Sequence, residues 1–589
     1  MKKFLIYTLA TITGIIIASI LLFIIVLSSV SIMVASGDKA VTVSDNTILV
    51  LKAGVEIPDK GNPSPWSGFD ISSMSFSPTP GLNEILGNIK KAASDKKISG
   101  ILIENGLISP GWATTEEIRN ALLKFKESGK FIISYSDYIL TQEGYFLSTS
   151  ANKIYINPGA SMDFRGLSGE VMFYKKALEK IGVDVQVIRH GKFKGAVEPF
   201  ILDEMSKENR EQIKDYIGSI WNHVVEGISA TRKIPVDQVN KIADNLAALN
   251  APDALNNKLI DGLLYRDELI DTLKSITGIK KTDKIHYISM SKYSNVPDPA
   301  RTYSATNKIA VIYAEGNIIT GKGMDGTIGG TGYAELIRDQ RLDSNIRAIV
   351  LRVNSPGGSA SASDQMWREL NLAAKAKPVI VSMGNYAASG GYYISAPATK
   401  IYASPVTISG SIGVFGMIPN AGKLMKDKLG ISTETVNTNS HSDFPSLFRP
   451  LTNAEQQVMQ KSIENIYSDF VSRVADGRKM RKSAVDSIGQ GRVWSGIRAK
   501  EVGLVDEIGG LEDAIKEAAM EAKIEKYSIR EFPVTEDPYS KIISGLTGDI
   551  KMRLIEKELG VNAKYYNEIK EIAKMSGIMV RLPYFIEIH

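Results

Sequence analysis

The 589-residue chain contains no cysteine and only five histidines. Without cysteine it has no thiol nucleophile, disulfide or thiolate-bound metal, and it suits oxidising and reducing compartments alike. The histidines do not show the HExxH spacing of a zinc enzyme, so we expect neither a metal nor another cofactor. They are His190, His223, His286, His441 and His589.

Strong charge of one sign is also missing. Seventy Lys and Arg residues stand against 65 Asp and Glu residues, a formal net charge of +5. Nucleic-acid-binding proteins concentrate basic residues on one face, so we expect no nucleic-acid partner. The composition, 43% apolar and 23% charged, is ordinary for a globular protein. A chain of this length is too long to fold around a single hydrophobic core, so we expect at least two domains.

A long uncharged run, residues 4–37, follows Lys2 and Lys3. A membrane span needs about 20 apolar residues, whereas the apolar core of a cleaved signal has only about 7–15. The run therefore predicts an uncleaved anchor, with a cleaved signal as the alternative. The two lysines favour a cytoplasmic N-terminus, which would place everything after Asp38 on the far side of the membrane.

The rest of the chain alternates predicted strands and helices, and it does so twice. Residues 97–103 resemble residues 345–351, 248 positions later, and residues 151–158 resemble 398–405, 247 positions later. Strands that alternate with helices predict mostly parallel sheets, so we predict a duplicated α/β domain. The predicted organisation is an anchor (1–40), a first repeat (46–295), a linker (296–307), a second repeat (308–535) and a helical extension (536–589).

Two local patterns carry structural predictions. The sequence Thr114-Thr-Glu-Glu117 has the form of a capping box and predicts the start of a helix. The apolar run at 378–383 predicts a buried strand that ends in a turn at Gly384 and Asn385.

Ser389 follows that strand at the predicted mouth of a short helix, between small residues. Small neighbours allow a substrate backbone to approach one hydroxyl, and a helix start favours developing negative charge. Gly357 and Gly358 follow the preceding strand, and successive glycines there can turn N–H groups toward an oxyanion. Ser411 supplies a further hydroxyl. The small neighbours of Ser389 are Ala387, Ala388, Gly390 and Gly391.

The two repeats differ at these positions. The first repeat has Gln142 where the second has Ser389, and Phe164 where the second has Ser411, so it has no nucleophile. It does have Lys194 between apolar residues, where the second repeat has Ser442. A lysine acts as a general base when burial or a neighbouring cation lowers its pKa. We predict that each repeat holds half of a Ser–Lys pair.

Four charged or titratable residues lie close to Lys194 in the sequence. Arg189 and Lys192 are cations that could repel its ammonium group. His190 offers a Ser–His alternative, but it lies in a strand-like run and has no apparent carboxylate partner. Glu198 is predicted to be a structural ion-pair partner rather than a catalytic acid.

Five motifs resemble the signal peptide peptidase A (protease IV) family in its long, duplicated form. They are Phe-Lys-Gly-Ala-Val-Glu-Pro-Phe around Lys194, Arg-Val-Asn-Ser-Pro-Gly-Gly at 352–358, Ala-Ala-Ser-Gly-Gly-Tyr around Ser389, Thr-Ile-Ser-Gly-Ser-Ile-Gly around Ser411 and Arg-Leu-Pro-Tyr at 581–584. The resemblance covers nearly the whole chain. It implies an α/β fold of two tandem ClpP/crotonase-like domains with an N-terminal transmembrane helix.

The same resemblance implies a serine endopeptidase with a Ser–Lys dyad and no cofactor. Ser389 would be the nucleophile, Lys194 the general base and Ser411 the hydroxyl that supports the lysine. The oxyanion donors would be N–H groups at Gly357, Gly358 and Gly390. The resemblance further implies a homotetramer that degrades signal peptides and other apolar peptides. It would be a single-pass protein of the bacterial inner membrane, with the catalytic body on the periplasmic side.

Two other functions are compatible with these residues. A crotonase-like acyl-CoA enzyme shares the repeated units and the oxyanion glycines, although such enzymes usually employ carboxylates and need cytosolic CoA. The second alternative is a membrane-anchored scaffold without catalytic activity, because the first repeat taken alone resembles a domain that has lost its catalytic residues.

Overall fold

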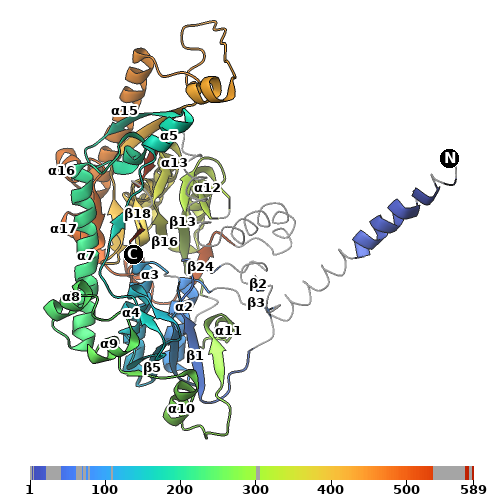
Figure 1. Ribbon diagram of the computed structural model, residues 1–589, viewed down its shortest axis with the longest axis vertical. Helices are drawn as coiled ribbons and strands as arrows, with labels where there is room; N and C mark the ends of the chain where they lie inside the picture. Colours follow the sequence, from blue (N-terminus) through green and yellow to red (C-terminus); the bar gives the residue numbers. More distant parts are fainter. Residues whose placement is uncertain are drawn as a thin grey trace.

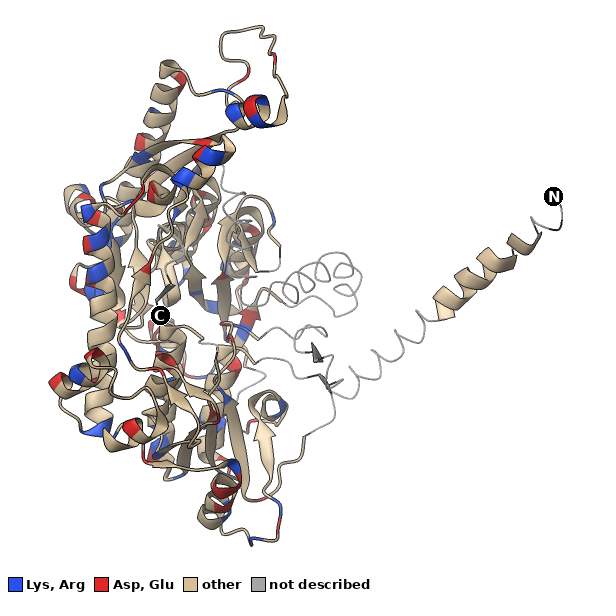
Figure 2. Cartoon of the chain, in the orientation of Figure 1, with Lys and Arg blue, Asp and Glu red and all other residues tan. Residues whose placement is uncertain are grey.

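The computed structural model describes residues 3, 6–8, 10–21, 41–61, 69–70, 75–76, 80–107, 110–299, 305–324, 326–534, 577–582 and 587–588. Residues 10–21 form an uncharged helix that stands apart from the body (Figures 1 and 2). None of the helices in these ranges is both long enough and apolar enough to cross a bilayer. Most of the predicted anchor, residues 1–40, lies outside the described residues.

The first half of the chain builds a six-stranded sheet in which every neighbouring pair is parallel, in the order β11-β7-β5-β4-β1-β12. Its strands are β1 (Thr47–Lys52), β4 (Ile98–Glu104), β5 (Phe131–Ser136), β7 (Lys153–Ile156), β11 (Gly262–Leu263) and β12 (Tyr287–Ser289). Its helices are α2 (Leu82–Ser94), α3 (Trp112–Phe125), α4 (Gln142–Ser148), α5 (Lys175–Ile181), α6 (Glu198–Ile201), α7 (Lys207–Arg232), α8 (Val236–Asp244), α9 (Ala251–Asn256), α10 (Arg266–Thr277) and α11 (Met290–Ser294).

The second half builds a sheet with the same strand order in equivalent elements, β23-β19-β18-β16-β13-β24, and adds β20 and β22 beside β18. Its strands are β13 (Lys308–Glu315), β16 (Ile346–Ser355), β18 (Val379–Ala388), β19 (Lys400–Ala403), β20 (Ile408–Gly410), β22 (Val493–Ser495), β23 (Glu507–Ile508) and β24 (Ser528–Phe532). Its helices are α12 (Gly330–Leu342), α13 (Ala360–Ala376), α14 (Gly390–Ser395), α15 (Asn453–Arg478), α16 (Lys482–Ile488), α17 (Gly496–Glu501) and α18 (Leu511–Glu521).

Equivalent side chains make equivalent bonds in the two halves. The hydroxyls of Tyr145 and Tyr392, 247 positions apart, donate to the carbonyl oxygens of Leu259 and Leu504. One turn later, Ser148 and Ser395 each donate to a glycine carbonyl of their own helix. The predicted duplication of an α/β domain is therefore confirmed; the predicted domain boundaries stay a prediction.

A third sheet joins the halves, in the order β10-β21-β25-β17-β14-β15. The first half contributes only β10 (Asp184–His190), which runs antiparallel to β21 (Val414–Asn420). The other strands are β14 (Asn317–Ile319), β15 (Thr327–Gly329), β17 (Gly357–Ser359) and β25 (Gly577–Arg581). Three short pairs complete the strands: β2 (Phe69–Asp70) with β3 (Ser75–Phe76), β6 (Ile139–Leu140) with β8 (Ser161–Met162), and β9 (Gly169–Glu170) with β26 (Glu587–Ile588).

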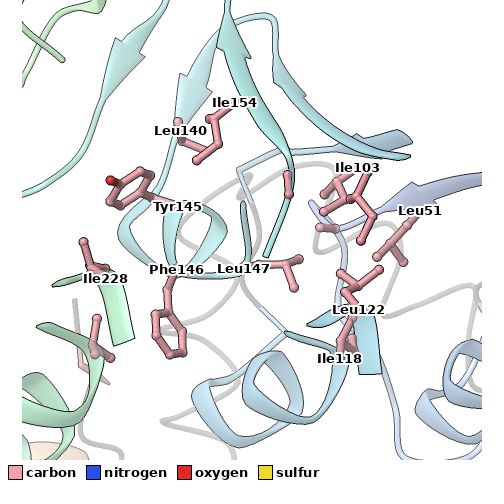
Figure 3. Close-up of a cluster of buried hydrophobic side chains, with 14 of the residues drawn as sticks. Leu51, Ile103, Ile118, Leu122, Leu140, Tyr145, Phe146, Leu147, Ile154 and Ile228 are labelled. Carbon is pink, nitrogen blue, oxygen red and sulfur yellow. The ribbon is translucent and has the colours of Figure 1, made fainter. Parts of the chain in front are cut away.

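The core of the first half lies between its sheet and the covering helices. In Figure 3 the apolar side chains of α4 face α7, and those of α3 face β1 and β4. Helix α7 packs on α4 and also on β22 of the second half, so it spans both domains along one side of the body (Figure 1). Acidic and basic residues are interspersed over the helices in Figure 2 rather than gathered by sign.

The buried strand predicted at 378–383 is present as part of β18, but the helix start and the turn predicted around the domain contact were wrong for one shared reason. Helix α3 begins at Trp112 after Gly111, and its start is capped by Asn385, whose Oδ1 accepts from the N–H groups of Ala113 (2.9 Å) and Thr114 (3.2 Å). Because Asn385 reaches across to the other domain, it does not form a turn, and β18 continues to Ala388. A cap supplied by a residue 271–272 positions away cannot be predicted from the local sequence.

A buried ion cluster also joins the domains. Arg352 of β16 is fully buried, and its guanidinium contacts Asp59 at 2.8 Å and Glu117 at 2.7 Å, both from the first half. A buried guanidinium without such partners is strongly destabilising, so the cluster fixes how the halves meet. The C-terminal extension, predicted as helical, shows strands β25 and β26 in its described residues, and residues 535–576 lie outside the description.

Candidate active site

Ser389 lies at the junction between β18 and α14 in a strained backbone conformation. Its φ is 56° and its ψ is −111°, and its N–H donates to the Gly410 carbonyl at 2.8 Å. A non-glycine residue at positive φ costs about 1–3 kcal/mol and persists only where the surroundings impose it. Such strain at a buried serine is typical of residues held in place for a function.

Lys194 comes from the first half and meets Ser389 inside the second. Its Nζ lies 2.9 Å from Ser389 Oγ, 3.0 Å from Ser411 Oγ and 3.2 Å from the Ser411 carbonyl oxygen. All three side chains have no solvent-exposed surface. The structure thus brings together the three predicted side chains, two from the second repeat and one from the first.

The Lys194 side chain runs through a passage that only glycines leave open. A Cβ on Gly491, whose φ is +83°, would lie 2.6 Å from the Lys194 backbone nitrogen. A Cβ on Gly413 would lie 3.1 Å from Lys194 Cδ, and the ring of Phe415 has its centroid 6.0 Å from Nζ. Burial among these groups lowers the pKa of the Lys194 amine well below its usual value, because the ammonium form loses its hydration. The amine therefore loses its proton at a lower pH than the amine of an exposed lysine does.

The segment that carries Lys194 is hydrogen-bonded to both domains at Phe193. The Phe193 N–H donates to the Gln490 carbonyl at 2.9 Å, and Gln212 of α7 donates to the Phe193 carbonyl at 3.0 Å. The Oε1 of Gln212 also accepts from Val493 N–H of β22, at 3.1 Å. Gln212 therefore links the lysine segment to the second domain, a role that the sequence did not suggest.

The charged neighbours of Lys194 pair with one another rather than with its amine. Arg189 lies 3.7 Å from Glu198 and donates to the Lys194 carbonyl at 3.4 Å. Glu198 is buried and accepts bonds from Ser206 and Asn209, as expected for a structural residue. Repulsion from Arg189 is thus not what lowers the lysine pKa; burial is. The His190 ring stacks on Tyr467, with centroids 3.9 Å apart.

The glycines beside Ser389 permit close backbone approach. Gly357 has φ +97°, and a Cβ there would lie 2.7 Å from the Gly390 nitrogen. The prediction of Gly357 as an oxyanion donor needs correction, because its own N–H donates to Ser355 Oγ at 3.1 Å. Gly358 and Gly390 are the two remaining predicted donors. Within the described ranges, no three His, Asp or Glu side chains are grouped to hold a metal ion.

Comparison with known proteins decides the family. The model of peptidase family S49 matches the chain twice, at residues 124–280 and 371–525, which together exceed half of its length. The chain belongs to peptidase family S49. The second S49 match contains Ser389 and Ser411, and the first contains Lys194, so each match falls on one half of the cluster.

Full-length relatives agree with this S49 assignment. The chain is 38% identical to Protease 4 of Salmonella typhi over 81% of this chain and 77% of the relative. It is 36% identical to Protease 4 of Haemophilus influenzae, covering 83% and 82%, and 33% identical to the chloroplastic serine protease SPPA of Arabidopsis thaliana, covering 85% and 74%. The resemblance to the long signal peptide peptidase A family is therefore confirmed.

Proposed function

We propose that this chain is a membrane-anchored serine endopeptidase in which Ser389 and Lys194 act as a catalytic dyad. The observation that carries the proposal is the 2.9 Å contact between Ser389 Oγ and a lysine amine that is fully buried. A solvated lysine would be protonated and could not act as a base, whereas burial supplies the neutral amine that the role requires.

In the proposed reaction, the neutral Lys194 amine takes the proton of Ser389, and Oγ attacks the carbonyl carbon of a peptide bond. The C–N bond breaks as the Lys194 ammonium returns the proton to the leaving amine, which leaves an ester on Ser389. Water then attacks the ester, with Lys194 again taking and returning the proton. Ser411 orients the amine through its hydroxyl and its carbonyl.

The developing oxyanion is stabilised by the backbone N–H groups of Gly358 and Gly390. Preorganised donors of this kind contribute about 10²–10³ in kcat in other serine peptidases. Gly357 contributes through its missing side chain, because a Cβ there would collide with the Gly390 nitrogen.

The proposed substrates are signal peptides and other apolar peptides at the bacterial inner membrane. The uncharged run at residues 4–37 supports a single-pass anchor with a cytoplasmic N-terminus. The small residues around Ser389 support small or unbranched side chains next to the scissile bond. By similarity to its family we also propose a homotetramer.

The decisive experiment is active-site labelling combined with a peptidase assay on the full chain. We expect a fluorophosphonate to label Ser389 and apolar peptide esters to be hydrolysed, with the Ser389→Ala variant losing both. Ser395→Ala is the matched control, since this buried serine lies on the next turn of α14 without contact to Lys194. Labelling of another residue, or full activity of Ser389→Ala, would refute the dyad. An acyl-CoA enzyme or a scaffold would show neither labelling nor peptide cleavage.

A further inference from the structure

Strand β25, from the C-terminal end of the chain, lies between the two strands that flank Ser389. It is antiparallel to β17 on one side, where Gly358 is paired with Val580, and to β21 on the other, where Phe415 is paired with Met579. Strands β17 and β21 do not contact each other in the sheet order; β25 separates them. Without β25, two open strand edges would face each other about 10 Å apart, which is the width of one inserted strand.

The register of β25 places one of its carbonyl groups at the proposed oxyanion donors. The Leu582 N–H donates to the Pro356 carbonyl at 2.6 Å. Because hydrogen-bonded pairs alternate along an antiparallel ladder, Gly358 and Val580 form the next such pair. The Gly358 N–H therefore points to the Val580 oxygen, and the Val580 N–H points to the Gly358 oxygen.

Glycine geometry places the same oxygen beside Gly390. A Cβ on Gly357 would lie 2.3 Å from the Val580 oxygen, and a Cβ on Gly390 would lie 3.1 Å from it. The Val580 side chain is fully buried in the apolar core of the second domain, and that of Leu582 is buried in the core of the first. The segment is thus held as a tightly bound peptide would be.

We propose that β25 occupies the peptide-binding slot of this enzyme as an internal pseudosubstrate, and that peptide substrates bind only after it is displaced. The inference rests on the proposed function, in which Ser389 attacks a carbonyl at Gly358 and Gly390. The ligand class is an extended peptide that adds a strand between β17 and β21, with a buried aliphatic side chain at the position of Val580. Beyond the slot, strand β26 pairs with β9 of the first half, so the C-terminal segment is held by both halves of the chain.

The first test locks β25 in place in the full chain. Ser359 and Met579 form a non-hydrogen-bonded pair, with Cα atoms about 4.5 Å apart, a separation that a disulfide accepts. The double variant Ser359→Cys, Met579→Cys forms one defined disulfide because the chain has no other cysteine. We expect oxidation to lower kcat/KM for an apolar peptide ester at least about tenfold, because a smaller fraction of the molecules has an empty slot. Reduction should restore the original value. The two single-cysteine variants are the controls.

The second test releases β25. Val580→Pro removes the N–H that bonds to Gly358, and proline is not accepted inside a central strand. We expect binding of a fluorescent peptide with the sequence of residues 577–582 to tighten about tenfold, because the competing segment is gone. The control Val580→Ala keeps the N–H and should change binding less. The peptide-binding assay is run in the Ser389→Ala background, so that it needs no catalysis.

The outcomes separate the two proposals. Measurable turnover that is equal in the oxidised and reduced double variant, or equal peptide binding in Val580→Pro and its parent, would overturn the pseudosubstrate. If no variant hydrolyses any peptide ester while binding is lost in the locked form and gained in Val580→Pro, the slot stands and the proposed catalysis fails.

Discussion

The two halves of this S49 peptidase have the same arrangement of strands and helices, and each contributes part of the candidate active site. Their sheets have the same strand order, and Tyr145 and Tyr392 donate equivalent hydrogen bonds. At the position of Ser389 the first half has Gln142, whose side chain binds the N–H groups of Arg165 and Gly166. Packing and hydrogen bonding maintain the shared strand order, and they do not constrain which residues stand at the edge of the sheet.

The residues at the positions equivalent to the candidate active site explain why the first half has no such site of its own. Phe164, in place of Ser411, is fully buried and packs edge-on against Tyr145. In the second half, the position of Lys194 is taken by the exposed Ser442, in a segment with no counterpart of β10. The comparison shows that Lys194 reaches Ser389 because β10, which precedes it, pairs with β21 of the other domain.

Replacing the lysine should give the largest effect. We expect Lys194→Met to lower kcat at least about 10³-fold, as loss of a dyad member does in related chemistry, whereas Ser442→Met should leave kcat unchanged. In the parent, kcat/KM should rise with pH as the amine, whose pKa burial lowers, gives up its proton. Hydrolysis of a peptide ester across a pH series measures both. Equal kcat in Lys194→Met and its parent would contradict the assignment.

The same variant should be more stable than its parent at neutral pH. The pKa of Lys194 is lower in the folded chain than its ordinary 10.5. The unfolded chain therefore binds more protons between these values, and the free energy of unfolding rises with pH there by about 1.4 kcal/mol per unit. Lys194→Met abolishes that rise, so its advantage should shrink as pH approaches 10.5. Thermal unfolding at several pH values tests this, and a constant difference would contradict it.

Narrowing the passage of the lysine should give the next largest effect. Gly491→Ala places a methyl against the Lys194 backbone, and a displacement of about 1 Å can cost about 10²-fold in rate. Gly129→Ala in the first half is the matched control, because its φ is +78° but nothing lies within 4 Å of the added Cβ. Both glycines have a similar positive φ, +83° and +78°, so a comparable loss of kcat in the two variants would refute the steric explanation.

Removing the supporting hydroxyl should have a smaller effect. Ser411→Ala leaves Lys194 its bonds to Ser389 and to the Ser411 carbonyl. A hydrogen bond is worth about 1 kcal/mol net, so we expect kcat to fall about five- to tenfold. The steady-state rate on a peptide ester measures this, with Ser395→Ala as the control. A loss as large as that of Lys194→Met would make Ser411 a full member of the catalytic unit.

Adding a serine to the first half should have the smallest effect on activity. Gln142→Ser in the Ser389→Ala background supplies a hydroxyl at the equivalent position. Among the described residues Gln142 bonds to Arg165 and Gly166 and not to a lysine, so we expect no peptidase activity. The loss of the Gln142 bonds should lower stability by about 1–3 kcal/mol. Activity above that of Ser389→Ala alone would show that the first half retains a working base.

Local patterns were sufficient to predict most of the fold. The alternation of strands and helices and its duplication were predicted, because the apolar spacing of segments such as Ile98–Glu104 and Phe131–Ser136 already matches their packing. The start of α3 was not predictable, since its cap comes from Asn385 of the other domain. The strand at Gly577–Arg581 was missed because a strand of this kind is fixed by its neighbours β17 and β21.

The site shows the same division. Ser389 and Lys194 could be located because comparison of the repeats reveals which half lacks which group. Gln212 and Gly491 could not, because their importance lies in contacts across the domain boundary. Gly357 was assigned as a donor from its place after a strand, and only the position of Ser355 Oγ shows that its N–H is already engaged.

The passage formed by Gly491 has a consequence for the timing of biosynthesis. Residue 194 leaves the ribosome almost 300 residues before residue 491 completes the walls around its side chain. At about 5–20 residues per second, roughly 15–60 s separate the two events. In the proposed mechanism, the lysine would be solvated and protonated during that interval, and the nascent chain could not digest itself or its neighbours. A peptidase with this mechanism would therefore stay inactive until its synthesis is nearly finished.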